Sequence, residues 1–301
     1  MAPELHARVM TALITPFDPS GRVDCGAAAE LAARLTGRGS GGFVVAGTTG
    51  EAPTLSAAEK LELCAAVRRA VDGRAAVWLN TGSYDTAESV RLSAAAGEAG
   101  AQGLMAVVPY YSRPPQQGLL RHFAAIAAAS SLPLMVYNIP GRTGTNLLPQ
   151  TLAALVAEAA QVTAVKEASR DLEQAAEIVR LLPPGFHVYS GDDQLTLPLV
   201  AVGARGVISV ASHLVPERIA ALVDACAQGQ WDLARRLHLE LLPLYRALFC
   251  TTNPIPVKVA LRLCGFPAGG FRLPLCEPTA AEASSIERAV AEYGLAGTLA
   301  G

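Results

Sequence analysis

The chain contains 301 residues, of which 51% are hydrophobic and 17% are charged, and its formal net charge is −2. The near balance of basic and acidic groups excludes the positive surface that nucleic-acid-binding and anionic-membrane-binding proteins need. The length fits one α/β barrel with an appendage. The low share of charged residues predicts that part of the surface is buried between subunits, so we expect an oligomer.

The cysteines and the N-terminus bear on the cellular compartment. The six cysteines are widely scattered and form no CxxC pair, a pattern typical of reduced thiols in the cytoplasm. The N-terminus carries Glu4 and Arg8 and no apolar core, so we expect no signal peptide. The longest uncharged run, 123–141, is interrupted by serine, proline and asparagine, so we expect no membrane span.

Eight short apolar runs rich in strand-forming residues recur along the first two thirds of the chain. Alanine- and leucine-rich segments of helical period separate them, so the pattern predicts a β-strand and an α-helix repeated eight times. Eight parallel strands with right-handed crossovers close into a (β/α)₈ barrel. An open doubly wound sheet is the alternative, weakened because no GxGxxG follows the first run. The runs are 9–17, 42–49, 75–82, 103–111, 133–140, 162–169, 187–193 and 206–212.

Local signals mark where the helices begin and end. Ser56 with Glu59, and Asp85 with Glu88, have capping-box spacing and predict two helix starts. Glycine pairs before strands, as in 39–42, predict left-handed helix ends. Beyond about residue 215 the strand pattern stops. We therefore predict a barrel over 1–225 that carries the active site, and a helical region over 226–301 packed on it.

Lysine is rare in this chain, and one lysine has a special position. There are three lysines and 21 arginines, and only Lys166 lies at the end of a predicted strand. Unlike arginine, a desolvated lysine can lose its proton and become a nucleophile. We predict that Lys60 is solvated and that Lys258 begins a late helix. The alternative for Lys166 is a strand-end lysine that reaches solvent or pairs with a carboxylate.

Hydroxyl groups surround this lysine at the predicted strand ends, where barrel active sites lie. No histidine and carboxylate cluster has metal-ligand spacing, so we expect no metal and no cofactor. What remains is amine chemistry, in which Lys166 condenses with a ketone and Tyr137 on the neighbouring strand moves the proton. The turn 48–50 suits a bound carboxylate. The strand-end groups are Thr48, Thr49, Tyr110, Tyr111, Tyr137, Asn138, Lys166, Ser190, Gly191, Asp192, Ile208 and Ser209.

Each of these residues taken alone has a plainer interpretation. The tyrosines 110 and 111 fit a packing role, and the threonines 48 and 49 fit an ordinary polar turn. Arg142 fits a solvated loop charge. For Glu51, and for the pair 192–193, we favour capping of backbone N–H groups over acid catalysis.

Seven sequence blocks taken together closely resemble the dihydrodipicolinate synthase family, also called 4-hydroxy-tetrahydrodipicolinate synthases. The resemblance extends from about Leu13 to Leu275. It is specific because the order and spacing agree, whereas GTTGE alone would indicate only the wider superfamily of pyruvate-dependent lyases. The blocks are GTTGEAPTLS (47–56), VVPYYSRP (107–114), VYNIPGRTG (136–144), AVKEAS (164–169), YSGDD (189–193), GVISV (206–210) and NPIPVK (253–258).

The resemblance implies a lyase that condenses pyruvate with L-aspartate 4-semialdehyde and cyclises the product, in the branch to diaminopimelate and lysine. Lys166 would form the Schiff base with pyruvate. Tyr137 would exchange protons at the imine, and Thr48 would link it in a relay to Tyr111, which in this family reaches the neighbouring subunit's site. The family is usually a homotetramer built as a dimer of dimers.

The resemblance also implies how the two substrates are held. Thr49 would hold the pyruvate carboxylate, and the backbone of Ile208 would line the same pocket. Gly191 belongs to the same substrate-binding group. Arg142 would bind the carboxylate of L-aspartate 4-semialdehyde.

One departure from the family concerns feedback inhibition. Family members inhibited by lysine use polar residues and histidines after GTTGE and an asparagine after the third strand. This chain instead has Ala52, Pro53, Ala57, Lys60 and Tyr84, while Glu88 and Tyr110 remain. We therefore predict weak lysine inhibition or none.

Two other functions are compatible with these patterns. One is another Schiff-base lyase or dehydratase of the superfamily, acting on a sugar acid or a hydroxy-oxo acid. The other is a pyruvate-binding regulator without turnover. The presence of both Lys166 and Tyr137 argues against the regulator.

Overall fold

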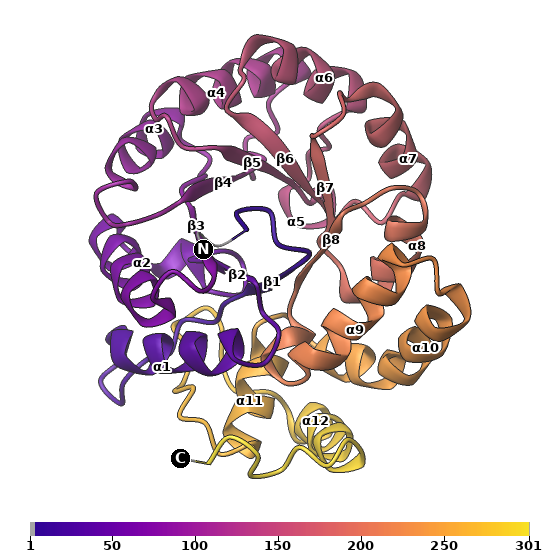
Figure 1. Ribbon diagram of the computed structural model, residues 1–301. Coiled ribbons are helices and arrows are strands. Elements are labelled where there is room, and N and C mark those ends of the chain that lie inside the picture. Colours follow the sequence, from indigo (N-terminus) through magenta and orange to yellow (C-terminus); the bar gives the residue numbers. More distant parts are fainter. Residues whose placement is uncertain (1–3, 301) are drawn as a thin grey trace.

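The computed structural model describes residues 4–300 and contains a closed eight-stranded parallel barrel whose strands pair in chain order, β1 to β8 (Figure 1). All eight predicted strands are present, and each begins within one residue of its predicted start. Each strand ends earlier than predicted, and the residues beyond it form the loops of the barrel mouth. The strands are β1 Val9–Ala12, β2 Gly42–Val45, β3 Ala76–Asn80, β4 Gly103–Val107, β5 Leu134–Asn138, β6 Val162–Glu167, β7 His187–Ser190 and β8 Gly206–Ser209.

Helices surround the barrel and cover the outer face of every strand (Figure 1). Both predicted helix starts are present, but of these two pairs only Ser56 with Glu59 forms a reciprocal capping box. Asp85 caps its helix alone, because Glu88 accepts a hydrogen bond from the Ser83 hydroxyl (2.9 Å) instead. The barrel helices are α1 Cys25–Thr36, α2 Ala57–Val71, α3 Thr86–Ala95, α4 Gln116–Ala128, α5 Pro140–Thr143, α6 Pro149–Glu158, α7 Leu172–Leu181, α8 Thr196–Ala201 and α9 Pro216–Ala227, with short 3₁₀ turns at Ala52–Thr54, Asp193–Leu195 and Ala211–His213.

Two hydrophobic cores follow from the alternation of side chains along each strand. Val136 and Val165 point outward and pack in the large core beneath the helices. Their strand neighbours Tyr137 and Ala164 point inward, into a smaller core that fills the barrel. The barrel is thus packed inside, and its polar groups lie at the strand ends.

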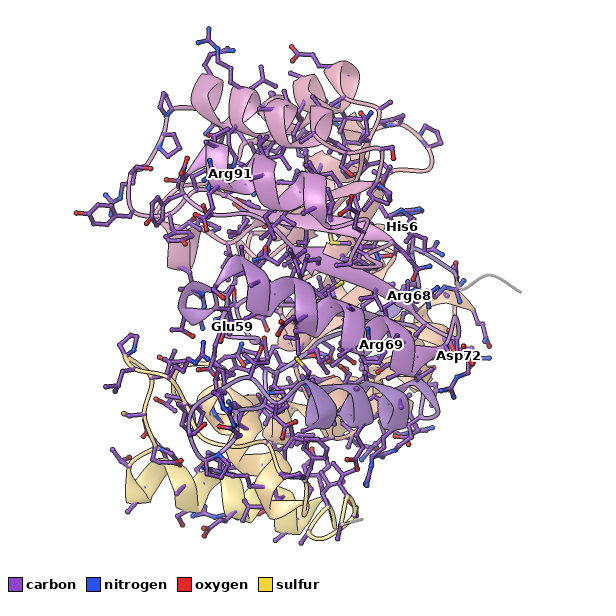
Figure 2. The ribbon with its side chains drawn as sticks, turned by 90° about the vertical axis from the view of Figure 1, so that its left-hand side faces the viewer. His6, Glu59, Arg68, Arg69, Asp72 and Arg91 are labelled. Carbon is purple, nitrogen blue, oxygen red and sulfur yellow. The ribbon has the colours of Figure 1, made fainter. Side chains whose placement is uncertain are left out.

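The N-terminal segment lies across one end of the barrel (Figure 1). The carbonyl oxygen of Leu5 accepts a hydrogen bond from the indole of Trp78 (3.0 Å), which is fully buried inside the barrel. His6 lies at this end, whereas Glu59 lies at the other side of the molecule, toward the C-terminal helices (Figure 2). One end of the barrel is therefore covered, and the site must be sought at the other.

Three further helices follow α9, namely α10 Trp231–Leu248, α11 Ile255–Leu263 and α12 Ala280–Glu292, and they lie together beside the barrel (Figure 1). An ion pair between Arg272 and Glu59 (2.6 Å) ties this region to the start of α2. The division into 1–225 and 226–301 stays a prediction. Across residues 4–300, no helix is long and apolar enough to cross a membrane.

Candidate active site

Lys166 and Tyr137 lie side by side at the open end of the barrel. They are directly paired residues on the neighbouring strands β6 and β5. Both therefore point to the same side of the sheet, and Lys166 Nζ lies 4.3 Å from the centre of the Tyr137 ring. The predicted proximity of the two side chains is a direct result of strand register.

Burial changes the chemistry of the Lys166 amine. Its side chain is 5% exposed, and desolvation of the ammonium lowers its pKa from 10.5 to about 8. The carboxylate of Asp193 opposes this decrease in pKa, and the guanidinium of Arg142 adds to it. At pH 7 the neutral, nucleophilic form is then about 300-fold more abundant than for an ordinary lysine.

Burial favours the protonated form of the Tyr137 phenol. Its ring is 3% exposed, and burial raises the pKa of its phenol, although a hydrogen bond with the Thr48 side chain opposes that increase. Thr48 follows β2, so the contact joins two strand ends that are far apart in sequence. A neutral phenol next to an amine can both donate and accept a proton.

Gly191 follows β7 and packs directly against Lys166. A methyl group in place of its hydrogen would lie 2.7 Å from Ala168 Cβ and 3.1 Å from Lys166 Cε. The absence of a side chain here lets the lysine lie close to the backbone, so only glycine fits without displacing it.

The turn after β2 presents polar groups next to this pair. Thr49 is buried, and its Oγ1 accepts a hydrogen bond from Asn253 Nδ2 (2.9 Å). Among residues 4–300, the backbone N–H groups of Thr48 and Thr49 donate to no backbone carbonyl. Unpaired N–H groups beside hydroxyls suit a carboxylate.

A cavity of about 210 Å³ opens above Tyr137. It brings together three of the predicted site residues, Thr48, Tyr137 and Arg142. Arg142 Nη2 also donates to the backbone oxygen of Asn253 (3.3 Å). The cavity lining consists of Thr48, Ala52, Pro53, Lys60, Asn80, Gly82, Val107, Tyr110, Tyr137, Ile139, Arg142 and Thr143.

Two lining residues, Lys60 and Asn80, were missed by the sequence interpretation. The prediction that Lys60 is solvated is wrong, because its side chain is 6% exposed and burial lowers its pKa. Its place on the inner side of α2 is the reason. Asn80 ends β3 and leaves its buried Oδ1 without a hydrogen-bond partner among the described residues. Asn80 could have been identified from the sequence, because it lies at the carboxyl end of a predicted strand, where barrel active sites lie.

Tyr111 and Ile208 occupy opposite extremes of exposure. Tyr111 is 94% exposed and has a left-handed backbone (φ 71°), and it does not line the cavity of its own chain. Its neighbour Tyr110 does line the cavity and packs edge-on against Tyr84, with 5.3 Å between ring centres. Ile208 is buried in the barrel interior with Tyr137.

The acidic residues near the mouth divide into two kinds. Asp192 caps the 3₁₀ turn at Gln194 as predicted, and Asp193 accepts from the N–H groups of Val210 and Ala211. Glu51 also accepts from a backbone N–H, as predicted, but from the distant Arg272 (3.3 Å), and its carboxylate pairs with the buried Lys258 at 2.8 Å.

Other groups with catalytic potential serve the fold. His213 Nε2 accepts from the backbone N–H of Ile14 (3.1 Å), and burial lowers its pKa to about 4, so it is neutral and already bonded. Ser190 donates to the backbone oxygen of Asp192 (2.7 Å). In the described part of the chain, no three His, Cys, Asp or Glu side chains form a group that could hold a metal ion.

A closed (β/α)₈ barrel with a desolvated lysine and a buried tyrosine at its mouth defines a class of enzyme, the lysine-dependent barrel lyases that form imines with ketones. Residues 5–293 match the model of the Dihydrodipicolinate synthetase family. The chain belongs to this family, as the seven sequence blocks indicated.

Known relatives are similar over almost the whole chain. A 4-hydroxy-tetrahydrodipicolinate synthase from Heliobacterium modesticaldum is 51% identical over 96% of both chains. The lysine-bound structure of the Cyanidioschyzon merolae enzyme is 45% identical, with a TM-score of 0.95 over 97% of this chain and 99% of that one. A pyruvate complex of the chloride-inhibited enzyme from Acinetobacter baumannii is 34% identical, with a TM-score of 0.92 over 97% and 100% of the two chains.

Proposed function

We propose that this protein is a lyase that condenses pyruvate with L-aspartate 4-semialdehyde to give 4-hydroxy-tetrahydrodipicolinate, in the branch to diaminopimelate and lysine. The observation that carries the proposal is the Lys166 amine, which is buried at a strand end and has a pKa of about 8. Family membership and relatives that share about half of its residues support the choice of substrates.

Lys166 would act as the nucleophile. Its neutral amine adds to C2 of pyruvate, and loss of water leaves a protonated imine, which accepts electrons when a proton leaves the methyl group. The resulting enamine forms a carbon–carbon bond to the aldehyde carbon of the second substrate. The amino group of that substrate then displaces Lys166, closing the ring and releasing the amine for another cycle.

Tyr137 and Thr48 would move the protons of these steps. Tyr137 is within reach of the imine nitrogen because its ring faces Lys166 Nζ at 4.3 Å. It would donate as the carbinolamine loses water and again as the aldehyde oxygen becomes a hydroxyl, and it would accept from the substrate amino group as that group displaces Lys166. In the assembled protein, the exposed Tyr111 of a neighbouring subunit would continue the relay to solvent.

The two carboxylates would be bound separately. Thr49, with the free N–H groups of its turn, would hold the pyruvate carboxylate beside Lys166, where Gly191 and the Ile208 backbone leave room for it. Arg142 lies at the outer part of the cavity and would bind the carboxylate of the semialdehyde. This arrangement would orient both carbon atoms that react.

A trapping experiment tests the proposal. Borohydride is added to the protein with pyruvate, and the intact mass is compared for the wild type and Lys166→Ala, with consumption of L-aspartate 4-semialdehyde followed on the same samples. We expect a pyruvyl adduct and consumption in the wild type and neither in the variant. An adduct without consumption would indicate a lyase for another aldehyde, such as a sugar acid, and no adduct would overturn the imine mechanism.

We also propose that the chain assembles as a homotetramer, a dimer of dimers, in the cytoplasm. The support is the 94% exposed ring of Tyr111 beside the half-buried Tyr110, together with the low share of charged residues. Sedimentation velocity at micromolar concentration tests the assembly, and a monomer would contradict the proposed relay between subunits.

A further inference from the structure

A buried ion pair joins the C-terminal helical region to the turn that follows β2. Lys258 on α11 and Glu51 at the end of the turn have fully buried side chains, and Lys258 Nζ lies 2.8 Å from Glu51 Oε1. Lys258 Nζ also donates to the backbone oxygens of Thr15 (3.0 Å) and Gly270. All three ammonium hydrogens thus have acceptors, as a buried cation requires.

The same pair fixes the backbone of the turn. Glu51 has a left-handed backbone (φ 56°, ψ 36°), which is unfavourable for a residue with a Cβ. Its side chain forms no hydrogen bond within its own 3₁₀ turn. It reaches Lys258 and the backbone N–H of Arg272 (3.3 Å) instead. The turn is therefore held from outside, by residues more than 200 positions away.

A second contact from the same C-terminal segment reaches the same turn. Asn253 lies five residues before Lys258, and its Nδ2 donates to Thr49 Oγ1 at 2.9 Å. Thr49 lies two residues before Glu51, so the segment 253–258 holds the turn at both of these points. The hydrogen of the Thr49 hydroxyl stays free for a ligand, because the bond from Asn253 uses only an oxygen lone pair.

We propose that Lys258 and Asn253 are positioning residues that aim the Thr49 hydroxyl and the N–H groups of its turn at the carboxylate of pyruvate. The inference rests on the proposed function and deepens it, because it assigns the C-terminal region a part in binding the first substrate. The surroundings suit lysine in particular. Its ammonium lies 4.4 Å from the centre of the Phe17 ring and 5.1 Å from that of Phe271, and a compact ammonium with three donors matches the three acceptors around it.

The test is the pyruvate concentration that gives half-maximal borohydride trapping. The variants are Lys258→Met with Glu51→Gln, which removes both charges together, and Asn253→Ala, which leaves the ion pair intact. Glu51→Gln alone keeps an acceptor for Lys258 but leaves its buried ammonium without a counter-charge. The matched control is Arg262→Met with Glu277→Gln, which removes the more exposed ion pair that Arg262 of α11 forms with Glu277 (2.5 Å).

We expect the half-saturating pyruvate concentration to rise about ten-fold or more in the three test variants and to stay within about two-fold in the control. The trapping rate at saturating pyruvate and its pH dependence should stay close to the wild type, because Lys166 itself is untouched. A loss of folding alone would lower the amount of trapped protein without moving the half-saturating concentration.

Two negative outcomes have different meanings. If the wild type traps no pyruvate, the proposed function fails. If the wild type traps pyruvate and the folded Glu51→Gln and Asn253→Ala proteins show unchanged half-saturation, the ion pair and Asn253 serve only the fold and the inference is overturned. Should the variants at Glu51 unfold, Asn253→Ala, which leaves the ion pair intact, still decides the matter.

Discussion

Replacing Lys166 by methionine should abolish activity and stabilise the protein. The reason is the cost of burying a cation. The pKa of Lys166 is about 8 in the folded protein and 10.5 for an ordinary lysine, so at pH 7 the folded protein binds this proton less tightly than the unfolded chain does. A difference of 2.5 pKa values corresponds to about 3 kcal/mol in the free energy of unfolding. Methionine has a similar length and carries no such cost.

The size of the effect depends on pH and gives an internal control. Below pH 8 the lysine is protonated in both the folded and the unfolded protein, and the full cost applies. Above pH 10.5 it is neutral in both, and the cost disappears. The advantage of Lys166→Met should therefore fall from about 3 kcal/mol at pH 7 to about 1 kcal/mol at pH 10.

Urea unfolding of the two proteins at equal concentration, at pH 7 and at pH 10, measures this difference. Intact-mass trapping with pyruvate should show no adduct in the variant. An unchanged or lower free energy of unfolding at pH 7 would refute the argument, because it would mean that the Lys166 ammonium is solvated or paired well enough to bear no cost. A gain of equal size at both pH values would assign the stabilisation to packing instead.

Three further predictions concern the mouth of the barrel. Tyr137→Phe should still form the pyruvyl adduct but lower kcat about 100-fold or more, because the proton shuttle is lost; a steady-state assay with both substrates measures this, and wild-type kcat would exclude the role. Gly191→Ala should slow adduct formation about ten-fold, because the new methyl group would lie 2.7 Å from Ala168 Cβ. Adding borohydride at successive times after pyruvate measures the rate, and an unchanged rate would mean that the loop moves freely. L-Lysine should inhibit weakly or not at all, because the Lys60 ammonium lines the cavity, although the C. merolae relative was solved with lysine bound; a sub-millimolar inhibition constant in a rate assay would contradict this.

The position of the predicted strand ends indicated from sequence alone that Tyr137 and Lys166 lie close together. Strand register explains the success: once 134–138 and 162–167 are neighbouring parallel strands, Tyr137 and Lys166 become directly paired residues. The start of each strand was equally readable, since glycines and polar residues precede the apolar runs. The strand ends were placed too late, partly because buried apolar residues continue beyond some strands, such as Leu13 and Ile14 after β1 and Val108 after β4.

The sequence did not reveal contacts that depend on tertiary packing. Lys60 lies in a helical pattern next to a glutamate, which suggested a solvated face, and only the packing of α2 against the barrel buries it. The pairing of Glu51 with Lys258 joins residues 207 positions apart, and no local pattern indicates such a contact. Asn253 was noticed only as the first residue of one of the blocks that indicated the family.

The covered end of the barrel has a kinetic consequence. Trp78 fills the interior and is bonded to the Leu5 carbonyl, so molecules can enter and leave only through the mouth. Lys166 is buried, whereas Arg142 is exposed. In the proposed reaction we therefore expect pyruvate to bind first, at the deeper position, and the aldehyde second. The cyclised product would leave through the same opening before the next turnover begins.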